Sequence, residues 1–160
     1  FRAREAARFL SLDVGEGGVR RLDANGDLWF EEYPSSEPSL VLNGFIYTMF
    51  GLWDLWRVTR EEPFRADFNR CVRTLERNLH KYDVGYWSLY DQLKGELVRY
   101  YYQKNVHVPQ MAVLHQLTGL GIFEEYRARW ASQITPLNFF RVQVMYRVRP
   151  RIRKLKALVS

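Results

Sequence analysis

Hydrophobic positions along this chain follow two kinds of helical pattern in its first half. Residues 39–59 are apolar over most of their length, whereas residues 64–79 place apolar side chains on one face and arginines on the other. A continuous apolar run predicts a buried helix, and a one-sided pattern predicts an amphipathic helix at the outside of the fold. We therefore expect the two segments to pack together.

The second half of the chain also has helical patterns, separated by glycine and proline. Residues 107–117 predict one helix, which Gly119 ends, and residues 122–134 predict another, which Pro136 stops. Pro136 itself suits the first turn of a last helix. Pro150 is expected to break or kink that helix, because proline inside a helix removes a hydrogen bond.

Short strands are predicted between the helices. Polar and apolar residues alternate about Asn25 and Gly26, a dipeptide typical of tight hairpin turns, so residues 19–23 and 27–32 are expected to pair. Residues 83–92 suit a short hairpin or an extended loop. The fold class predicted from these patterns is mainly α, an incomplete α/α toroid with short β-hairpins at the end that carries the active site.

The start of the chain resembles the middle of a helix. Ala3, Ala6, Ala7 and Leu10 have helical spacing, and no capping residue comes before them. We therefore interpret residues 1–160 as a single C-terminal toroid domain cut from a longer protein.

Composition adds a strongly basic C-terminal part. The chain has 160 residues and a net charge of +6, but residues 126–160 hold nine Lys or Arg and no Asp or Glu. Such a segment is usually a solvated helix face, which we favour, and otherwise a surface for an acidic polysaccharide, anionic lipid or nucleic acid. Nucleic acid is not expected, and membrane contact of this segment is the less favoured alternative. The single Cys71 says nothing about the compartment.

The stretch from Trp29 to Met49 contains the most distinctive chemistry. Pro34 removes a backbone donor and biases the residue before it toward extended geometry, so Tyr33 is expected at a fixed corner. Ser39 is a plausible N-cap for the following helix. Asn43 and Gly44 lie in its first turns, where glycine permits close approach of a ligand or another backbone.

This stretch, EEYPSSEPSLVLNGFIY, resembles the C-terminal helical domain of D-glucuronyl C5-epimerases. The resemblance continues through GLWDL, YDVGYWSLYD and HVPQMAVLHQL and covers roughly residues 25 to 130. It implies inversion of C5 in glucuronic acid units of a heparosan-like polysaccharide. That reaction removes a proton α to a carboxylate and returns one to the opposite face of the ring. It also needs positive charge or hydrogen bonds for the substrate carboxylate.

The resemblance implies tyrosines as proton carriers. Tyr33 matches the tyrosine of the E-Y-P motif, and Tyr90 matches one in a Y-D-x-G…Y-D hairpin. A third family tyrosine lies a few residues before a histidine that matches His107. Strict alignment puts Gln103 at the position of this tyrosine, and a shift of one residue puts Tyr102 there. Tyr90 is followed closely by cations, so we expect it to be the more acidic phenol and Tyr33 to stay protonated.

Other residues are expected to bind substrate. The family has an arginine where this chain has Leu93, so Lys94 or Arg99 is the candidate partner of the substrate carboxylate. Glu32 is a candidate for a sugar hydroxyl, although adjacent glutamates at a strand end are ordinarily surface carboxylates. The remaining candidates are Asn43, which is more often structural, and His107, expected as a hydrogen-bonded wall of the pocket.

No cofactor and no metal are expected, because the histidines lack partners at ligand spacing. The interpretation is therefore an isomerase that acts on an acidic polysaccharide, with a homodimer possible. A polysaccharide lyase or glycoside hydrolase of the toroid class and a non-catalytic glycan-binding domain are the alternatives. The compartment is undetermined: a secretory or Golgi lumen would suit an animal protein, and the envelope or cytoplasm a bacterial one.

Overall fold

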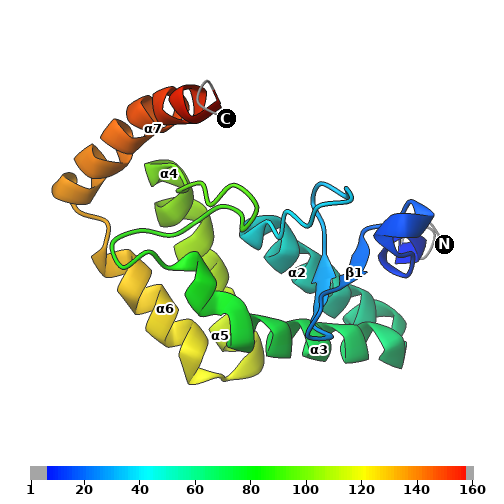
Figure 1. Ribbon diagram of the computed structural model, residues 1–160. Coiled ribbons are helices and arrows are strands. Elements are labelled where there is room, and N and C mark those ends of the chain that lie inside the picture. Colours follow the sequence, from blue (N-terminus) through cyan, green and yellow to red (C-terminus); the bar gives the residue numbers. More distant parts are fainter. Residues whose placement is uncertain (1–6, 158–160) are drawn as a thin grey trace. The chain divides into compact units, whose positions relative to one another are not determined.

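The computed structural model describes the backbone of residues 7–157 and the side chains as far as residue 148 (Figure 1). The chain is mainly helical, with one two-stranded sheet in its described part, which confirms the predicted class. Residues cluster into two compact units. Unit 1 comprises residues 1–84 and 89–96, and unit 2 comprises residues 85–88 and 97–160. The toroid and the single-domain organisation stay predictions.

The N-terminal helix predicted from Ala3, Ala6, Ala7 and Leu10 lies mostly outside the described residues. The described part begins with two short 3-10 helices, η1 (Arg8–Leu10) and η2 (Val14–Glu16).

The predicted hairpin is confirmed in unit 1. Strands β1 (Arg20–Leu22) and β2 (Leu28–Phe30) pair antiparallel, with Arg20 opposite Phe30. Gly26 in the turn has φ 77°, a backbone conformation that glycine adopts at low cost.

Two helices pack beside this hairpin in unit 1. They are α2 (Leu42–Thr59) and α3 (Glu62–Asn78), and the 3-10 helix η3 (Leu79–Tyr82) follows. Helix α3 is amphipathic as predicted, with Phe68, Cys71 and Leu75 buried on one face. Asp27 holds the hairpin to α3, because it accepts a hydrogen bond from Asn78 Nδ2 at 2.7 Å.

Two details of α2 correct the sequence analysis. The helix is not buried all round, since Tyr47 is 54% exposed and Val58 is 83% exposed. Ser39 is not its N-cap, because the helix begins at Leu42 and the Ser39 hydroxyl donates to Glu31 instead.

Residues 83–96 form the expected extended loop rather than a regular hairpin. Within unit 1, Leu89 N–H donates to Tyr82 O at 2.8 Å, and Tyr90 N–H donates to Glu96 O at 2.6 Å. The Leu42 N–H at the start of α2 donates to Tyr90 O at 3.0 Å. These bonds fix Tyr90 beside the first turn of α2.

Unit 2 is built from helices. A short α4 (Tyr100–Tyr102) passes into a π-helical turn, η4 (Gln103–His107), and then into α5 (Val108–Thr118). Gly119 ends α5 with φ 71°, as predicted. Helix α6 (Gly121–Ser132) packs against α5.

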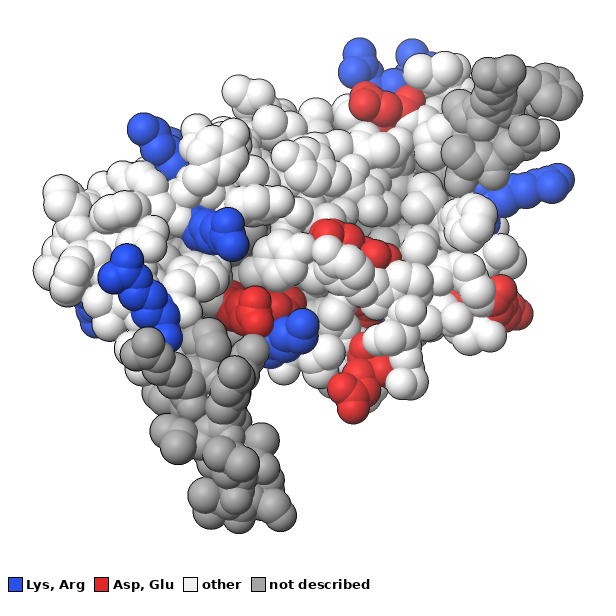
Figure 2. All heavy atoms as spheres, turned by 90° about the horizontal axis from the view of Figure 1, so that it is seen from above, with Lys and Arg blue, Asp and Glu red and all other residues white. Residues whose placement is uncertain are grey.

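The last helix, α7 (Pro136–Ala157), starts at Pro136 as predicted. It is not broken at Pro150, because the backbone is helical on both sides of that residue. None of the described helices is long and apolar enough to cross a membrane. Over the face shown in Figure 2, acidic and basic side chains are scattered, with no continuous patch of one sign among the residues drawn in colour.

Candidate active site

Tyr33, Tyr90 and Glu32 come together in unit 1. Tyr33 lies at the corner after β2 that Pro34 was expected to set, and it is 57% exposed. The Tyr90 hydroxyl donates to Glu32 Oε1 at 3.0 Å, and the Tyr33 and Tyr90 hydroxyl oxygens are 3.5 Å apart. Three of the residues selected from sequence therefore form one hydrogen-bonded cluster at the surface.

The Glu32 carboxylate lies directly over Gly44 in the first turn of α2. A Cβ atom built on Gly44 would stand 2.3 Å from Glu32 Oε2, so any other residue would force the carboxylate to move. The start of a helix also favours negative charge, because its first N–H groups point outward. Gly44 is thus closely approached, but the approaching group is the Glu32 side chain rather than the ligand or backbone that was expected.

The loop that carries Tyr33 is held by the neighbouring Glu31, although adjacent glutamates at a strand end are ordinarily surface carboxylates. Glu31 is buried, and its Oε2 accepts from Ser39 Oγ at 2.7 Å, Ser39 N at 3.2 Å and Leu40 N at 3.1 Å. Its Oε1 lies 3.0 Å from Arg21 Nε. These hydrogen bonds hold the backbone at Leu40, whose φ is 48°. Positive φ is unfavourable for a residue other than glycine.

Two more residues support this loop, and sequence reasoning missed both. Arg21 on β1 also donates to the Ser35 carbonyl, and the buried Tyr82 hydroxyl donates to Leu40 O at 2.6 Å. Burial raises the pKa of Tyr82 well above its usual value, so its hydroxyl remains a donor. The only sequence signal for the role of Arg21 was its position in the predicted first strand, which pairs with the strand that ends next to Glu31.

A cavity of about 260 Å³ opens beside the tyrosines. Lys94, Asp91 and Glu96 contribute charged side chains to its lining, and Lys94 was one of the two expected carboxylate-binding cations. Leu93 also lines it. The remaining lining residues are Tyr33, Ser35, Ser39, Val41 and Tyr90.

The acid–base expectation for Tyr90 is wrong. Partial burial raises its pKa, and the hydrogen bonds to Tyr33 and to the Glu32 carboxylate raise it further. Burial is the main cause of the raised pKa, and the Glu32 carboxylate that accepts from Tyr90 adds to it. Tyr90 is therefore a protonated donor in this structure, and Glu32 is the acceptor beside it.

Asn43 is buried in the first turn of α2, next to Gly44. It therefore lies at the same helix start as the Glu32 carboxylate. Its burial agrees with a structural amide, the role that sequence analysis favoured for it.

His107 lies in unit 2 and is completely buried. Its Nδ1 is 2.9 Å from Ser88 Oγ, and burial lowers its pKa to about 3. It is hydrogen-bonded as expected, but it is not a pocket wall, because no part of it is exposed.

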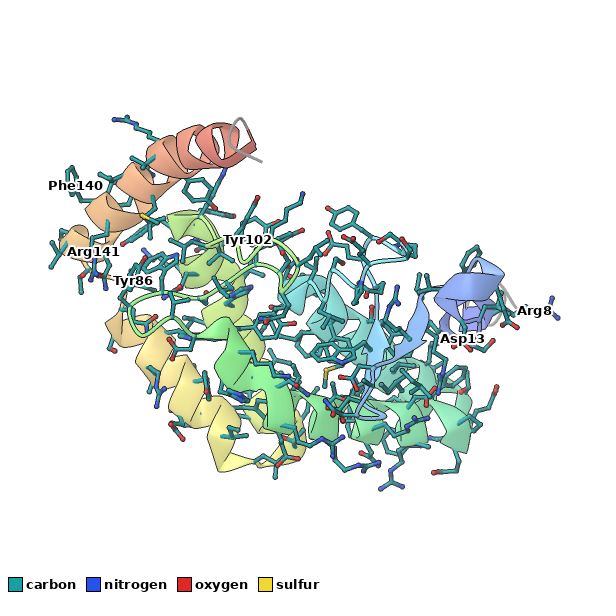
Figure 3. The ribbon with its side chains drawn as sticks, in the orientation of Figure 1. Arg8, Asp13, Tyr86, Tyr102, Phe140 and Arg141 are labelled. Carbon is teal, nitrogen blue, oxygen red and sulfur yellow. The ribbon has the colours of Figure 1, made fainter. Side chains whose placement is uncertain are left out.

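Tyr102 and Gln103, the two residues considered for the third tyrosine position, differ in burial. Gln103 has no exposed surface; its amide accepts from Ser88 and donates to Trp130 O at 3.0 Å, which makes it structural. Tyr102 is 37% exposed and lies at the end of α4 (Figure 3). A π-helical turn, η4, follows Tyr102 directly.

Arg99, the other candidate cation, precedes α4 in unit 2, and its guanidinium lies 5.9 Å from the centre of the Tyr146 ring. Within the described residues, no group of three His, Cys, Asp or Glu side chains is arranged to hold a metal.

Comparison with known proteins gives a family match and two curated relatives. The family model described as "D-glucuronyl C5-epimerase C-terminus" matches residues 2–132. The chain is 35% identical over 101 residues to "D-glucuronyl C5-epimerase" of Caenorhabditis elegans, a match that covers 56% of this chain and 16% of that protein. It is 32% identical over 128 residues to an uncharacterized protein of Methanocaldococcus jannaschii, covering 78% of this chain and 41% of that protein. The family model covers more than half of the chain, which therefore belongs to the family of D-glucuronyl C5-epimerase C-terminal domains.

Proposed function

We propose that the protein containing this chain inverts C5 of glucuronic acid units in a heparosan-like polysaccharide. The observation that carries the proposal is the cluster in which Tyr90 donates to Glu32 at 3.0 Å and lies 3.5 Å from the Tyr33 hydroxyl. A carboxylate acceptor beside two phenol donors suits abstraction of a proton next to a substrate carboxylate. Membership of the family supports the same reaction.

The chemistry assigns different roles to these groups. When the C5 proton leaves, its electron pair spreads into the substrate carboxylate and forms an ene-diolate. Donors placed at its oxygens stabilise that charge, and they must still carry their protons. Tyr90 meets this requirement because its pKa is raised. We therefore assign Glu32 as the base that takes the C5 proton, and Tyr90 and Tyr33 as the donors to the ene-diolate.

The short distance between the tyrosines supports this division. Groups that exchange protons with opposite faces of one carbon each approach it to about 3 Å, so they stand about 6 Å apart. The Tyr33 and Tyr90 hydroxyls are 3.5 Å apart, too close to lie on opposite sides of a sugar ring. Both therefore serve the same face or the carboxylate.

Inversion also needs an acid at the other face and a cation for the substrate carboxylate. The family resemblance implies a further proton-carrying tyrosine, Tyr102, which belongs to unit 2 and is 37% exposed. For the cation we propose Lys94, because it lines the same cavity as Tyr33 and Tyr90.

The test uses the full-length protein and unsulfated heparosan in D2O. Proton NMR should show loss of the C5 hydrogen signal of glucuronate and appearance of iduronate, with the chain length unchanged. An unsaturated uronate or shorter chains would instead identify a lyase or a hydrolase. Heparosan binding without any exchange at C5 would identify a non-catalytic glycan-binding protein.

A further inference from the structure

A second concave surface lies in unit 2 and is not used by the proposed reaction. It is a groove of about 570 Å³ between the segment that contains α4 and the first turns of α7, lined by Arg99, Tyr100, Tyr101, Phe139, Gln143 and Tyr146. Four of these six residues are aromatic.

The aromatic side chains are held in place from beneath. The Tyr100 ring stacks on the buried Trp87 with their centres 5.8 Å apart, and Phe139 meets Tyr100 edge-on at 5.0 Å. The Tyr146 hydroxyl donates to the Leu97 carbonyl, which orients that ring. Tyr101 is 67% exposed and Phe139 is 43% exposed, so the groove offers aromatic surface to a ligand.

Arg99 supplies the positive charge of the groove. Its guanidinium lies 5.9 Å from the centre of the Tyr146 ring, and none of the described carboxylates forms an ion pair with it. Unit 2 contains eleven Lys or Arg against two acidic residues, Glu124 and Glu125. Both glutamates are paired with arginines, Arg127 and Arg129, on α6. The charge of this unit therefore favours an anionic ligand.

We propose that this groove is a second glycan-binding site, which takes a uronic acid unit of an acidic polysaccharide. A sugar ring presents apolar C–H faces to aromatic rings and polar groups at its edge, and this combination suits the aromatic lining together with Gln143. The Arg99 guanidinium pairs with the sugar carboxylate. The proposal rests on the proposed function for the identity of the polymer.

The groove extends beyond the part of the chain that defines the family. Phe139, Gln143 and Tyr146 lie on α7, after the matched residues 2–132. Phe140 and Arg141 lie on α7 as well, and Arg141 packs over Tyr86 with 4.1 Å between its guanidinium and the ring centre (Figure 3). Arg141 does not line the groove, so it offers a matched control for charge.

The test measures binding of an unsulfated heparosan hexasaccharide to the full-length protein by calorimetry. Arg99→Gln should weaken binding about tenfold because it removes a charge-assisted contact, and Tyr101→Ala should weaken it about fivefold because it removes aromatic surface. Arg99→Lys should restore part of the affinity, whereas Arg141→Gln should leave it unchanged. The carboxyl-reduced hexasaccharide should bind weakly and be indifferent to Arg99→Gln.

If Arg99→Gln and Tyr101→Ala both bind the hexasaccharide with wild-type affinity, the groove is not a glycan-binding site. An equal loss in Arg99→Gln and Arg141→Gln would also overturn the proposal, because that result indicates general charge attraction. Exchange at C5 is measured separately. If the protein exchanges C5 hydrogen but its binding does not depend on Arg99, only the proposal of a second glycan site is wrong. If binding depends on Arg99 but no exchange occurs, only the proposed reaction is wrong.

Discussion

Glu32 and Gly44 are fitted to each other: the Glu32 carboxylate occupies the space that a side chain on Gly44 would need. The distance from Glu32 Oε2 to a Cβ built on Gly44 is 2.3 Å, less than any contact a real Cβ makes. The glycine therefore fixes where the proposed base lies, although it touches no substrate itself.

Gly44→Ala is the corresponding test. The added methyl group should displace the Glu32 carboxylate and lower C5 exchange by at least about tenfold, a 1.4 kcal/mol effect on the barrier. Gly51→Ala in the same helix is the control, because nothing lies within 4 Å of its Cβ position. It should keep full activity and gain about 0.5–1 kcal/mol of stability from better helix propensity. Equal activities of the two variants would contradict the role of Gly44.

Glu31→Gln should loosen the loop that presents Tyr33. The change removes the charge that faces Arg21 and weakens the bonds to Ser39 and Leu40. Because Arg21 is only partly buried, we expect a loss of about 2 kcal/mol in unfolding free energy, less than for a fully buried pair. Urea unfolding measures it, with Glu37→Gln on the same loop as an exposed control that should change stability little. A Glu31→Gln protein as stable as wild type would show that the network does not hold the loop.

His107 should make the stability of the fold sensitive to acid. Burial lowers its folded-state pKa from 6.5 to about 3, so the unfolded chain binds a proton that the folded chain does not. Its contribution is fully present above about pH 6.5 and is lost as the pH falls toward 3, at up to about 1.4 kcal/mol per pH unit.

The slope is measured by urea unfolding between pH 7 and pH 4. His107→Gln should have a shallower slope than wild type, and the exposed His80→Gln should keep the wild-type slope. Because carboxylates add their own pH dependence, the difference between variants is the readout. Identical slopes in all three proteins would contradict the assignment.

Local patterns predicted much of the fold. The hairpin turn at Asn25 and Gly26, the buried face of α3 and the stop at Gly119 each depend on a few neighbouring residues, and the structure confirms them. The π-turn before α5 had no sequence signal. Its place depends on Gln103, which bonds to Ser88 and Trp130, residues distant in sequence.

The sequence selected Glu32, Tyr33 and Tyr90, which lie together in the structure, but it did not predict the contacts that these residues make. Two adjacent glutamates look alike in sequence, yet Glu31 is buried beneath the loop and Glu32 is exposed at the tyrosines. The difference arises from pairing with Arg21 and from the space above Gly44, which are tertiary contacts. The same applies to Tyr90, whose sequence neighbours include cations while its spatial neighbour is a carboxylate.

The central claim, that Glu32 is the base of a C5 exchange reaction, is tested most directly by Glu32→Gln in the full-length protein. The substitution keeps the shape and a hydrogen-bond acceptor for Tyr90, but it removes the proton acceptor. Deuterium incorporation at C5 of heparosan in D2O should fall by about two orders of magnitude or more, the usual loss for a missing general base. Glu37→Gln should exchange at the wild-type rate, and exchange by Glu32→Gln at that same rate would contradict the account.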